Sequence, residues 1–223
     1  MRISNGEIFE RVFVNEPVDL HIVQEAGSKV KIVVVDLSDP SDPSDPSDIS
    51  NSITVEQCGE GCSTEIYALA YLRGEQRVTT ETHVKHAVGG GSSNQLIKFV
   101  LDDNARGHFI GDLKIAPDAQ QVEAHQTNRN LLLSETAEMR TQPQLEIYAD
   151  DVQATHGAST GQLDEAAIFY MRQRGICYQK ARQLLVNAFM KEILMNVQSD
   201  KVQGTKDREI LRTLLDSIDG VVE

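Results

Sequence analysis

The chain is poor in cysteine, tryptophan and positive charge. It has no tryptophan, three cysteines, and 21 Lys and Arg against 34 Asp and Glu residues, which gives a net charge of −13. This surplus of negative charge opposes binding to nucleic-acid phosphates and to anionic lipid surfaces. Three irregularly spaced cysteines are too few for the disulfide framework of a secreted domain. We therefore expect neither a nucleic-acid nor a membrane partner.

Long apolar runs are also missing. A membrane-spanning helix needs about 18 or more consecutive apolar residues, and the sequence has no such run. The residues after Met1 lack the apolar centre of a signal peptide. The chain still contains 40% hydrophobic residues, enough for a core. These features predict a soluble protein of the cytoplasm.

The first two thirds of the sequence read as short β-prone runs separated by turn residues. Regularly spaced strands suit either a sandwich or a solenoid, and the pattern alone does not choose between them. An acidic Ser-Asp-Pro repeat at residues 38–50 predicts a solvated loop, because proline prevents strand pairing; a calcium-binding loop is the minor alternative. The candidate strands are residues 8–14, 19–23, 30–37, 52–57, 64–72, 77–84, 95–101, 108–115, 120–127, 131–134 and 145–148.

Helical periodicity begins near residue 161. Asp164 can cap a helix N-terminus, and Gly175 suits a helix end. We therefore divide the chain into a β core at residues 1–160 and a C-terminal helical subdomain at residues 161–223. The expected buried stripes are Ala181, Leu184, Leu185, Ala188, Phe189 and Ile193 in a second helix, and Ile210, Leu211, Leu214, Leu215 and Ile218 in a third. Surplus apolar residues, which either fill the helix–sheet interface or dock a partner, are Phe169, Tyr170, Met190 and Met195.

Two local patterns suggest metal or acid–base chemistry. His156 follows Asp150 and Asp151, and an imidazole beside carboxylates can bind a metal or transfer protons. Residues five and six apart around a turn need not converge, however, and we expect His156 at a strand end or in a tight bend. Cys58 and Cys62 flank a flexible loop, but zinc sites favour a closer spacing and need more ligands, so we expect ordinary turn cysteines. No familiar enzyme motif occurs.

A longer signature runs through the second half of the chain. Its motifs are Gln142–Asp151, Thr155-His156-Gly157-Ala158, Gly161-Gln162-Leu163-Asp164-Glu165, Phe169-Tyr170, Arg172 and Arg174-Gly175-Ile176. In these motifs the chain resembles the SufB/SufD family of iron-sulfur cluster assembly proteins, most closely its SufD members. The resemblance is specific from about residue 94 to residue 194 and faint before that. It implies a right-handed parallel β-helix core. Of the sandwich and the solenoid that the strand pattern left open, we therefore expect the solenoid.

The resemblance also implies a role. It points to a non-catalytic scaffold subunit of the SUF system that pairs with a SufB-like subunit and docks a SufC-like ATPase. His156 matches a SufD histidine at the SufB interface, so a nascent iron-sulfur cluster is expected there, with no cofactor or metal in the isolated chain. Asn128 stands at or beside the position of a SufB cysteine. The residues expected to dock SufC are Phe169, Tyr170, Arg172 and Arg174.

Two alternatives from other classes remain. One is a metalloenzyme on a β-helix that uses His156 and the nearby carboxylates. The other is a purely structural homodimer whose free edge strands pair across a two-fold axis. Family members are considerably longer and begin with a helical region, so we expect this chain to be either a truncated piece or a shortened relative.

Overall fold

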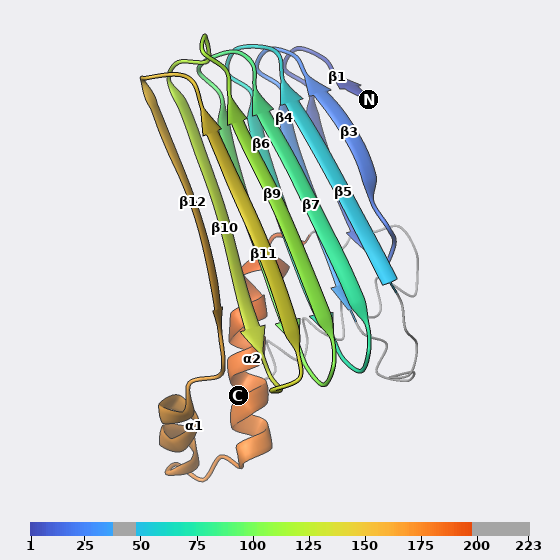
Figure 1. Ribbon diagram of the computed structural model, residues 1–223, viewed down its shortest axis with the longest axis vertical. Coiled ribbons are helices and arrows are strands. Elements are labelled where there is room, and N and C mark those ends of the chain that lie inside the picture. The colour runs from blue at the N-terminus through green and yellow to red at the C-terminus, as the bar shows by residue number, and fades with distance from the viewer. Residues whose placement is uncertain (38–47, 198–223) are drawn as a thin grey trace.

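The computed structural model describes residues 1–37 and 48–197, in which twelve strands form two parallel six-stranded sheets (Figure 1). The first sheet has the order β1-β3-β5-β7-β9-β11 and the second β12-β10-β8-β6-β4-β2. Successive strands alternate between the sheets, so the chain winds as a flattened solenoid and the predicted parallel β-helix is confirmed. The strands are β1 Arg2–Ile3, β2 Ile8–Val14, β3 Asp19–Gln24, β4 Lys29–Leu37, β5 Asp48–Gln57, β6 Ser63–Leu72, β7 Arg77–His86, β8 Ser92–Leu101, β9 Arg106–Ile115, β10 Val122–Leu132, β11 Glu138–Ile147 and β12 Val152–Gly161.

One coil of the solenoid takes about 30 residues, since Ser63 pairs with Ser92 and Ser92 with Glu123. Side chains point alternately into and out of the solenoid along each strand. Residues paired in register therefore form columns that run from coil to coil. These columns determine which side chains meet inside the molecule.

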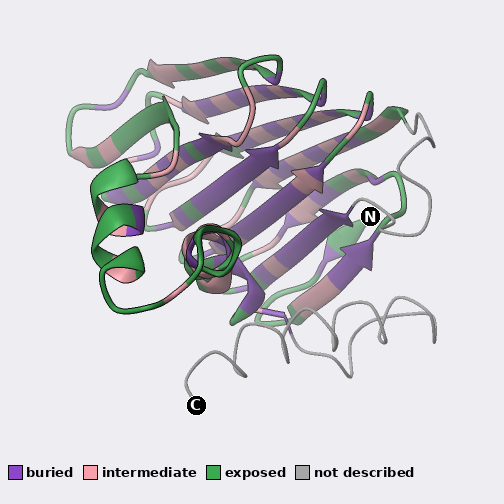
Figure 2. Ribbon diagram, turned by 90° about the horizontal axis from the view of Figure 1, so that it is seen from below, coloured by how far each residue is buried: buried purple, intermediate pink, exposed green. Residues whose placement is uncertain are grey.

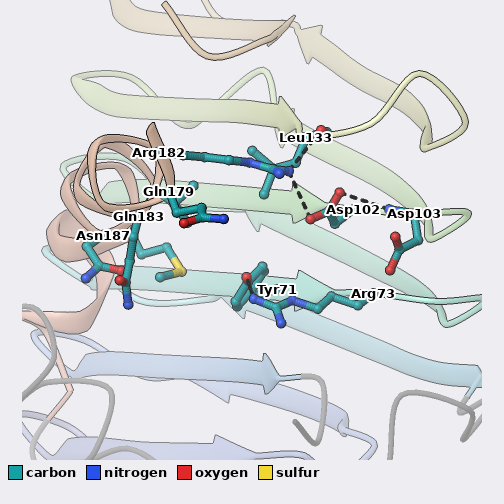
Figure 3. Close-up of a pocket in the computed structure, with 11 residues that line it drawn as sticks. Tyr71, Arg73, Asp102, Asp103, Leu133, Gln179, Arg182, Gln183 and Asn187 are labelled. Carbon is teal, nitrogen blue, oxygen red and sulfur yellow. Dashed lines mark hydrogen bonds and ion pairs between the residues drawn. The ribbon is translucent and has the colours of Figure 1, made fainter. Parts of the chain in front are cut away.

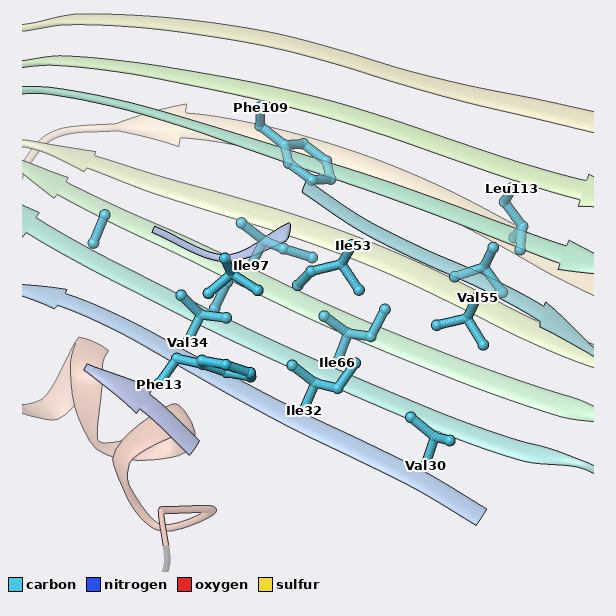
Figure 4. Close-up of a cluster of buried hydrophobic side chains, with 14 of the residues drawn as sticks. Phe13, Val30, Ile32, Val34, Ile53, Val55, Ile66, Ile97, Phe109 and Leu113 are labelled. Carbon is cyan, nitrogen blue, oxygen red and sulfur yellow. The ribbon is translucent and has the colours of Figure 1, made fainter. Parts of the chain in front are cut away.

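The central coils have an apolar interior, which Figure 4 shows in close-up. Ile32 and Ile66 are paired on neighbouring strands of the second sheet, and both are fully buried. Ile53 and Val55 face them from the first sheet and are also fully buried. Burial of such side chains contributes roughly 1.5–3 kcal/mol each relative to exposure, so this interior is the main source of stability.

The second sheet is covered on its outer face as well, by helix α2, Tyr178–Leu194 (Figure 2). Apolar side chains of the sheet such as Val33 and Leu69 form a second buried cluster with Val186, Met190 and Ile193 of the helix. No described helix lies on the outer face of the first sheet (Figure 1). None of the helices in residues 1–37 and 48–197 is long and apolar enough to span a bilayer.

A buried lysine fixes α2 on the sheet. Lys98 is 3% exposed and points from β8 toward the helix. Its Nζ donates to the carbonyl oxygen of Phe189 and to Oε2 of Glu192, both at 2.7 Å. The hydrogen bond from Lys98 holds the pKa of Glu192 below its ordinary value. The charge of Lys98 is thus compensated where the sheet meets the helix.

Several predicted boundaries are wrong. A single continuous strand, β10 (Val122–Leu132), replaces the two strands predicted at residues 120–127 and 131–134, because Asn128 and Asn130 turn inward and bond to each other. The strand β12 was not expected. The first three residues of β5 fall inside the predicted loop at 38–50.

The helices also differ from the prediction in part. Helix α1, Glu165–Arg172, begins as expected, since the side chain of Asp164 accepts from the Ala166 N–H at 2.8 Å. In α2, Val186 and Met190 are buried, whereas Ala188 is exposed and Phe189 half-buried. The stripe is shifted because the sheet meets a neighbouring face of the helix. The predicted third helix lies outside the described residues.

Candidate functional site

The last coil of the solenoid has two free edges. Among the described strands, β11 pairs only with β9 and β12 only with β10. Each of these strands is ten residues long, so each presents a row of backbone N–H and C=O groups with no neighbouring strand. Free edges of this length are templates for the addition of another chain.

His156 lies in the middle of the edge strand β12 and pairs with Gln126 of β10. Gln126 is buried and points into the solenoid, so His156, at the same position of the next coil, is on the interior side. It is nevertheless exposed, because no further coil of the described residues covers it. The expectation of a strand end or bend is therefore wrong: small residues around His156 weaken the β pattern, yet the strand is continuous.

The interior column that ends at His156 changes from apolar to polar along the solenoid. It runs through Ile32, Ile66, Gln95, Gln126 and His156 in successive coils. Both glutamines are buried, and Gln126 donates weakly to Gln95 at 3.5 Å. Oε1 of Gln126 has no hydrogen-bond partner in the described structure. A buried acceptor is therefore free one coil below His156.

Room for this carboxamide comes from the opposite sheet. A Cβ atom on Gly111 of β9 would lie 2.5 Å from Nε2 and 2.6 Å from Oε1 of Gln126. Any side chain at Gly111 would therefore displace the amide group of Gln126. The glycine keeps the polar column open up to the last coil.

Asn128 occupies the adjacent interior column. It pairs with Ala158 of β12, so Asn128 and His156 face the same interior from neighbouring strands, two positions apart in register. Asn128 is buried; its Nδ2 donates to Asn130 Oδ1 at 2.9 Å, and Asn130 donates back at 2.8 Å. A hydrogen-bonded amide pair, with no thiol, therefore stands beside His156.

The other predicted ligand candidates do not gather at His156. Asp150 and Asp151 lie in the turn before β12, and at 3.3 Å per residue the extended strand carries Asp151 roughly 16 Å from His156. Cys58 is exposed, while the Cys62 thiol is buried and donates to two backbone carbonyl oxygens at 3.1 Å. Within the described ranges, no group of three or more His, Cys, Asp or Glu side chains is placed to hold a metal ion.

A second histidine, one coil below His156, escaped the sequence reading. His125 is next to Gln126 but points to the outer face, where Nδ1 lies 2.8 Å from Thr155 Oγ1 and Nε2 lies 3.2 Å from Glu123 Oε1. Side chains alternate between the two faces of a strand, so once Gln126 is known to point inward, His125 must point outward. His125 is thus a natural comparison for His156.

The residues expected to dock a partner lie on α1 and the turn after it. Ile168 is the one buried residue of this helix, whereas Phe169 and Tyr170 are 63% and 58% exposed. The Arg174 guanidinium stacks 3.4 Å from the centre of the Tyr170 ring, and Arg172 is exposed beside them. Adjacent aromatic side chains that are exposed to solvent are typical of an interaction surface. Of the other surplus residues, Met190 fills the helix–sheet interface and Met195 is exposed.

A cleft of about 540 Å³ lies between α2 and the ends of β6 and β8 (Figure 3). Arg182 of α2 donates at 3.0 Å to both Asp102 Oδ2 and the carbonyl oxygen of Leu133. These bonds compensate its charge and hold the helix over the strand ends. The side-chain amides on this side of α2 face Tyr71 and Arg73 across the cleft; they belong to Gln179, Gln183 and Asn187. The residues that line the cleft come from separate segments of the chain, so no local sequence pattern predicted it.

Comparison with known proteins agrees with this architecture. A family model described as "SUF system FeS cluster assembly, SufBD core domain" matches residues 18–189. The chain belongs to the SufBD family. The match begins well before residue 94, so SufBD likeness extends through coils in which the sequence motifs were faint.

Three curated relatives illustrate the likeness. The iron-sulfur cluster assembly protein SufD of Escherichia coli is 38% identical over 154 residues, which are 69% of this chain and 36% of that protein. A SufBD family protein of Synechocystis is 38% identical over 154 residues, 69% of this chain and 34% of its own length. Protein ABCI7 of Arabidopsis thaliana, described as chloroplastic, is 32% identical over 172 residues, 77% of this chain and 35% of its length. The match thus spans about a third of each relative.

Proposed function

We propose that this chain is a non-catalytic scaffold subunit of a SUF iron-sulfur cluster assembly complex. It pairs with a SufB-like subunit along the free edges of β11 and β12, and it presents His156 to the nascent cluster at that junction. One observation carries the proposal: the interior column of the solenoid ends in an exposed histidine that no described strand covers.

His156 supplies one imidazole ligand, and the partner supplies thiolates. Iron-sulfur clusters are held mainly by cysteine thiolates, and none of the three cysteines lies on β10, β11 or β12. The second ring nitrogen of a metal-bound histidine usually donates to an oxygen that fixes its orientation. The unpartnered Oε1 of Gln126, one coil below, is the acceptor suited to that task.

Helix α1 supports a further part of the proposal, that the chain also docks a SufC-like ATPase. The exposed rings of Phe169 and Tyr170, with Arg172 and Arg174 beside them, form an apolar and basic surface joined directly to the last strand. A SufC-like ATPase docked there is connected to the cluster junction through β12. Movement of the docked subunit can therefore shift the edge that carries His156.

The direct test is native mass spectrometry of the chain mixed with SufB-like and SufC-like subunits. A complex that contains all three subunits supports the proposal. Failure to bind either partner, with the chain folded, contradicts it.

The role of His156 is tested by cluster reconstitution in the assembled complex. His156→Ala is expected to leave the stoichiometry unchanged and to lower the cluster yield several-fold. His125→Ala, on the outer face of the preceding coil, is the matched control and should keep the normal yield. Equal cluster yields from both variants would show that His156 does not take part in holding the cluster.

The docking surface is tested in the same mixture. The variant Phe169→Ala/Tyr170→Ala should lose the SufC-like subunit and keep the SufB-like one, because α1 and the edge strands are separate surfaces. Tyr148→Ala changes a ring that is equally exposed, at 58%, but lies at the opposite end of β12 from α1, and it should keep both subunits. Retention of the SufC-like subunit by the double variant would place its docking elsewhere.

A further inference from the structure

Most cations on the bare outer face of the first sheet are paired with carboxylates. Lys85 lies 3.7 Å from Glu56, and Lys114 lies 2.7 Å from Glu146. His83 is 3.7 Å from an oxygen of Asp112. Such pairing is expected for a chain whose net charge is −13. The face is therefore mostly neutralised.

One group of basic side chains on this face breaks the rule. Arg77, Arg106, His108 and Arg140 lie near the starts of β7, β9 and β11, and we call them the arginine cluster. Arg106 alone has an acidic partner, Glu138, at 3.7 Å. In the described part of the chain, the side chains of Arg77 and Arg140 have no ion pair or hydrogen bond, and His108 Nε2 is buried with no partner.

The sheet register places these basic side chains side by side. Arg77 pairs with Arg106 across β7 and β9, and His108 pairs with Arg140 across β9 and β11. The like charges of Arg77 and Arg106, at directly paired positions of the sheet, repel each other and reduce stability. An anion between them would turn this repulsion into attraction.

The cluster surrounds a hollow rather than a flat surface. A depression of about 250 Å³ is lined by Arg77, Arg106, His108 and Arg140, with Glu138 as its single carboxylate. An adjoining depression of about 400 Å³ also includes Arg77 and Arg106, but it contains three glutamates. The first hollow is therefore the cationic part of the pair, with space for a small ligand.

We propose that the arginine cluster binds a phosphate group carried by a small soluble molecule. Guanidinium groups bind oxyanions through paired N–H donors. Here three of them approach from three neighbouring strands, and a phosphate has enough acceptor oxygens to meet all three, whereas a carboxylate has only two. His108 also lines the hollow, and its Nε2 has no hydrogen-bond partner within the described residues. The site is on a different face from β12 and does not depend on the proposed scaffold function.

Isothermal titration with inorganic pyrophosphate tests the site, with acetate as the carboxylate probe. The unmodified chain should bind pyrophosphate, and acetate should bind at least about tenfold more weakly. Arg77→Gln/Arg140→Gln should lower the pyrophosphate affinity by at least about tenfold. The control Lys85→Gln/Lys114→Gln removes the same charge from the same face and should change the affinity less than about twofold, since those lysines are already paired.

Thermal unfolding separates loss of the site from loss of the fold. Without ligand, the double arginine variant should unfold at the same temperature as the unmodified chain or higher, because a repulsion has been removed. Pyrophosphate should raise the midpoint of the unmodified chain and not that of the variant. No binding to the unmodified chain, or equal weakening in both double variants, would overturn the proposal, since the second result would mean nonspecific attraction.

Discussion

The central coils and the last coil of this solenoid share one register but use their interior positions differently. In the column of Ile32, Ile66, Gln95, Gln126 and His156, the first four side chains are buried and the last is exposed. The column also passes from aliphatic to amide to imidazole side chains. Interior positions of the central coils therefore stabilise the fold, while the same positions in the last coil are available to a partner.

The largest expected difference between the two regions is in packing. Ile66→Ala should lower the free energy of unfolding by about 2–5 kcal/mol, because it leaves a cavity among fully buried neighbours. Val152→Ala, at a half-buried interior position of the last coil, should cost less than about 1 kcal/mol. Urea denaturation of both variants measures the contrast. Equal losses would show that the last coil is packed as tightly as the centre.

The central coils also contain two buried groups with opposite dependence on pH. Burial raises the pKa of Asp36 from 3.8 to about 7, although the hydrogen bond from Asn51 opposes the shift. The folded state therefore favours protonated Asp36, and stability falls as pH rises from about 4 to 7. Burial lowers the pKa of His86 from 6.5 to about 4. The folded state favours neutral His86, and stability falls as pH drops from 6.5 to about 4.

These two effects partly cancel between pH 4 and 6.5, so single variants should reveal them. Asp36→Asn keeps the size of the side chain and leaves the His86 effect, so stability should rise with pH across this range by roughly 1–3 kcal/mol. His86→Gln should produce the reverse slope. Urea denaturation at several pH values measures both. Parallel profiles for the unmodified chain and both variants would contradict the assignment.

The contact between α2 and the second sheet gives a smaller effect. Glu192→Gln should cost about 1–2 kcal/mol, because Lys98 is buried and loses its carboxylate partner. The pKa of Glu192 is lowered, so this contribution should be present above pH 4.5 and decline as pH falls below it. Adding Lys98→Met should recover most of the loss, because no buried charge then remains.

An exposed pair on β10, in the coil before the last, provides the control for that experiment. His125 and Glu123 lie 3.2 Å apart on the outer face, where water screens both groups. Glu123→Gln should leave the denaturation midpoint unchanged. A loss of stability equal to that of Glu192→Gln would show that the ion pair under helix α2 stabilises the fold no more than an exposed pair does.

A similarly small effect on stability is expected at His156 itself. The side chain is exposed and makes no hydrogen bond within the described chain, so His156→Ala should change the free energy of unfolding by less than about 0.5 kcal/mol. Its cluster yield in the assembled complex should nevertheless fall. A large loss of stability would mean that His156 is a structural residue.

Sequence reasoning located most of the solenoid because its central strands are rich in valine, isoleucine and leucine. It missed β12 for a physical reason. The residues around His156 are alanine, glycine, serine and threonine, which carry little β signal, and the strand is formed through its pairing with β10. The split of β10 at Asn128 has a similar cause: asparagine disfavours strands unless, as here, another buried amide satisfies it.

The candidate site could be predicted only in part. Family motifs pointed to His156 and to Phe169, but spacing placed His156 near Asp150, which the strand separates from it. The roles of Gln126, Gly111 and the arginine cluster depend on register between residues about 30 positions apart. Local sequence patterns do not reveal that register, because it emerges only when the coils are stacked.

Hydrogen exchange of the backbone amides is the most direct test of the central claim that the open coil is the junction with a partner. The chain is measured alone and in complex with a SufB-like subunit. We expect slower exchange in β11 and β12, whose outer edges pair with no described strand, and unchanged exchange in the central strands β6 and β8. Protection at β2 or α2, with β11 and β12 unchanged, would contradict the account.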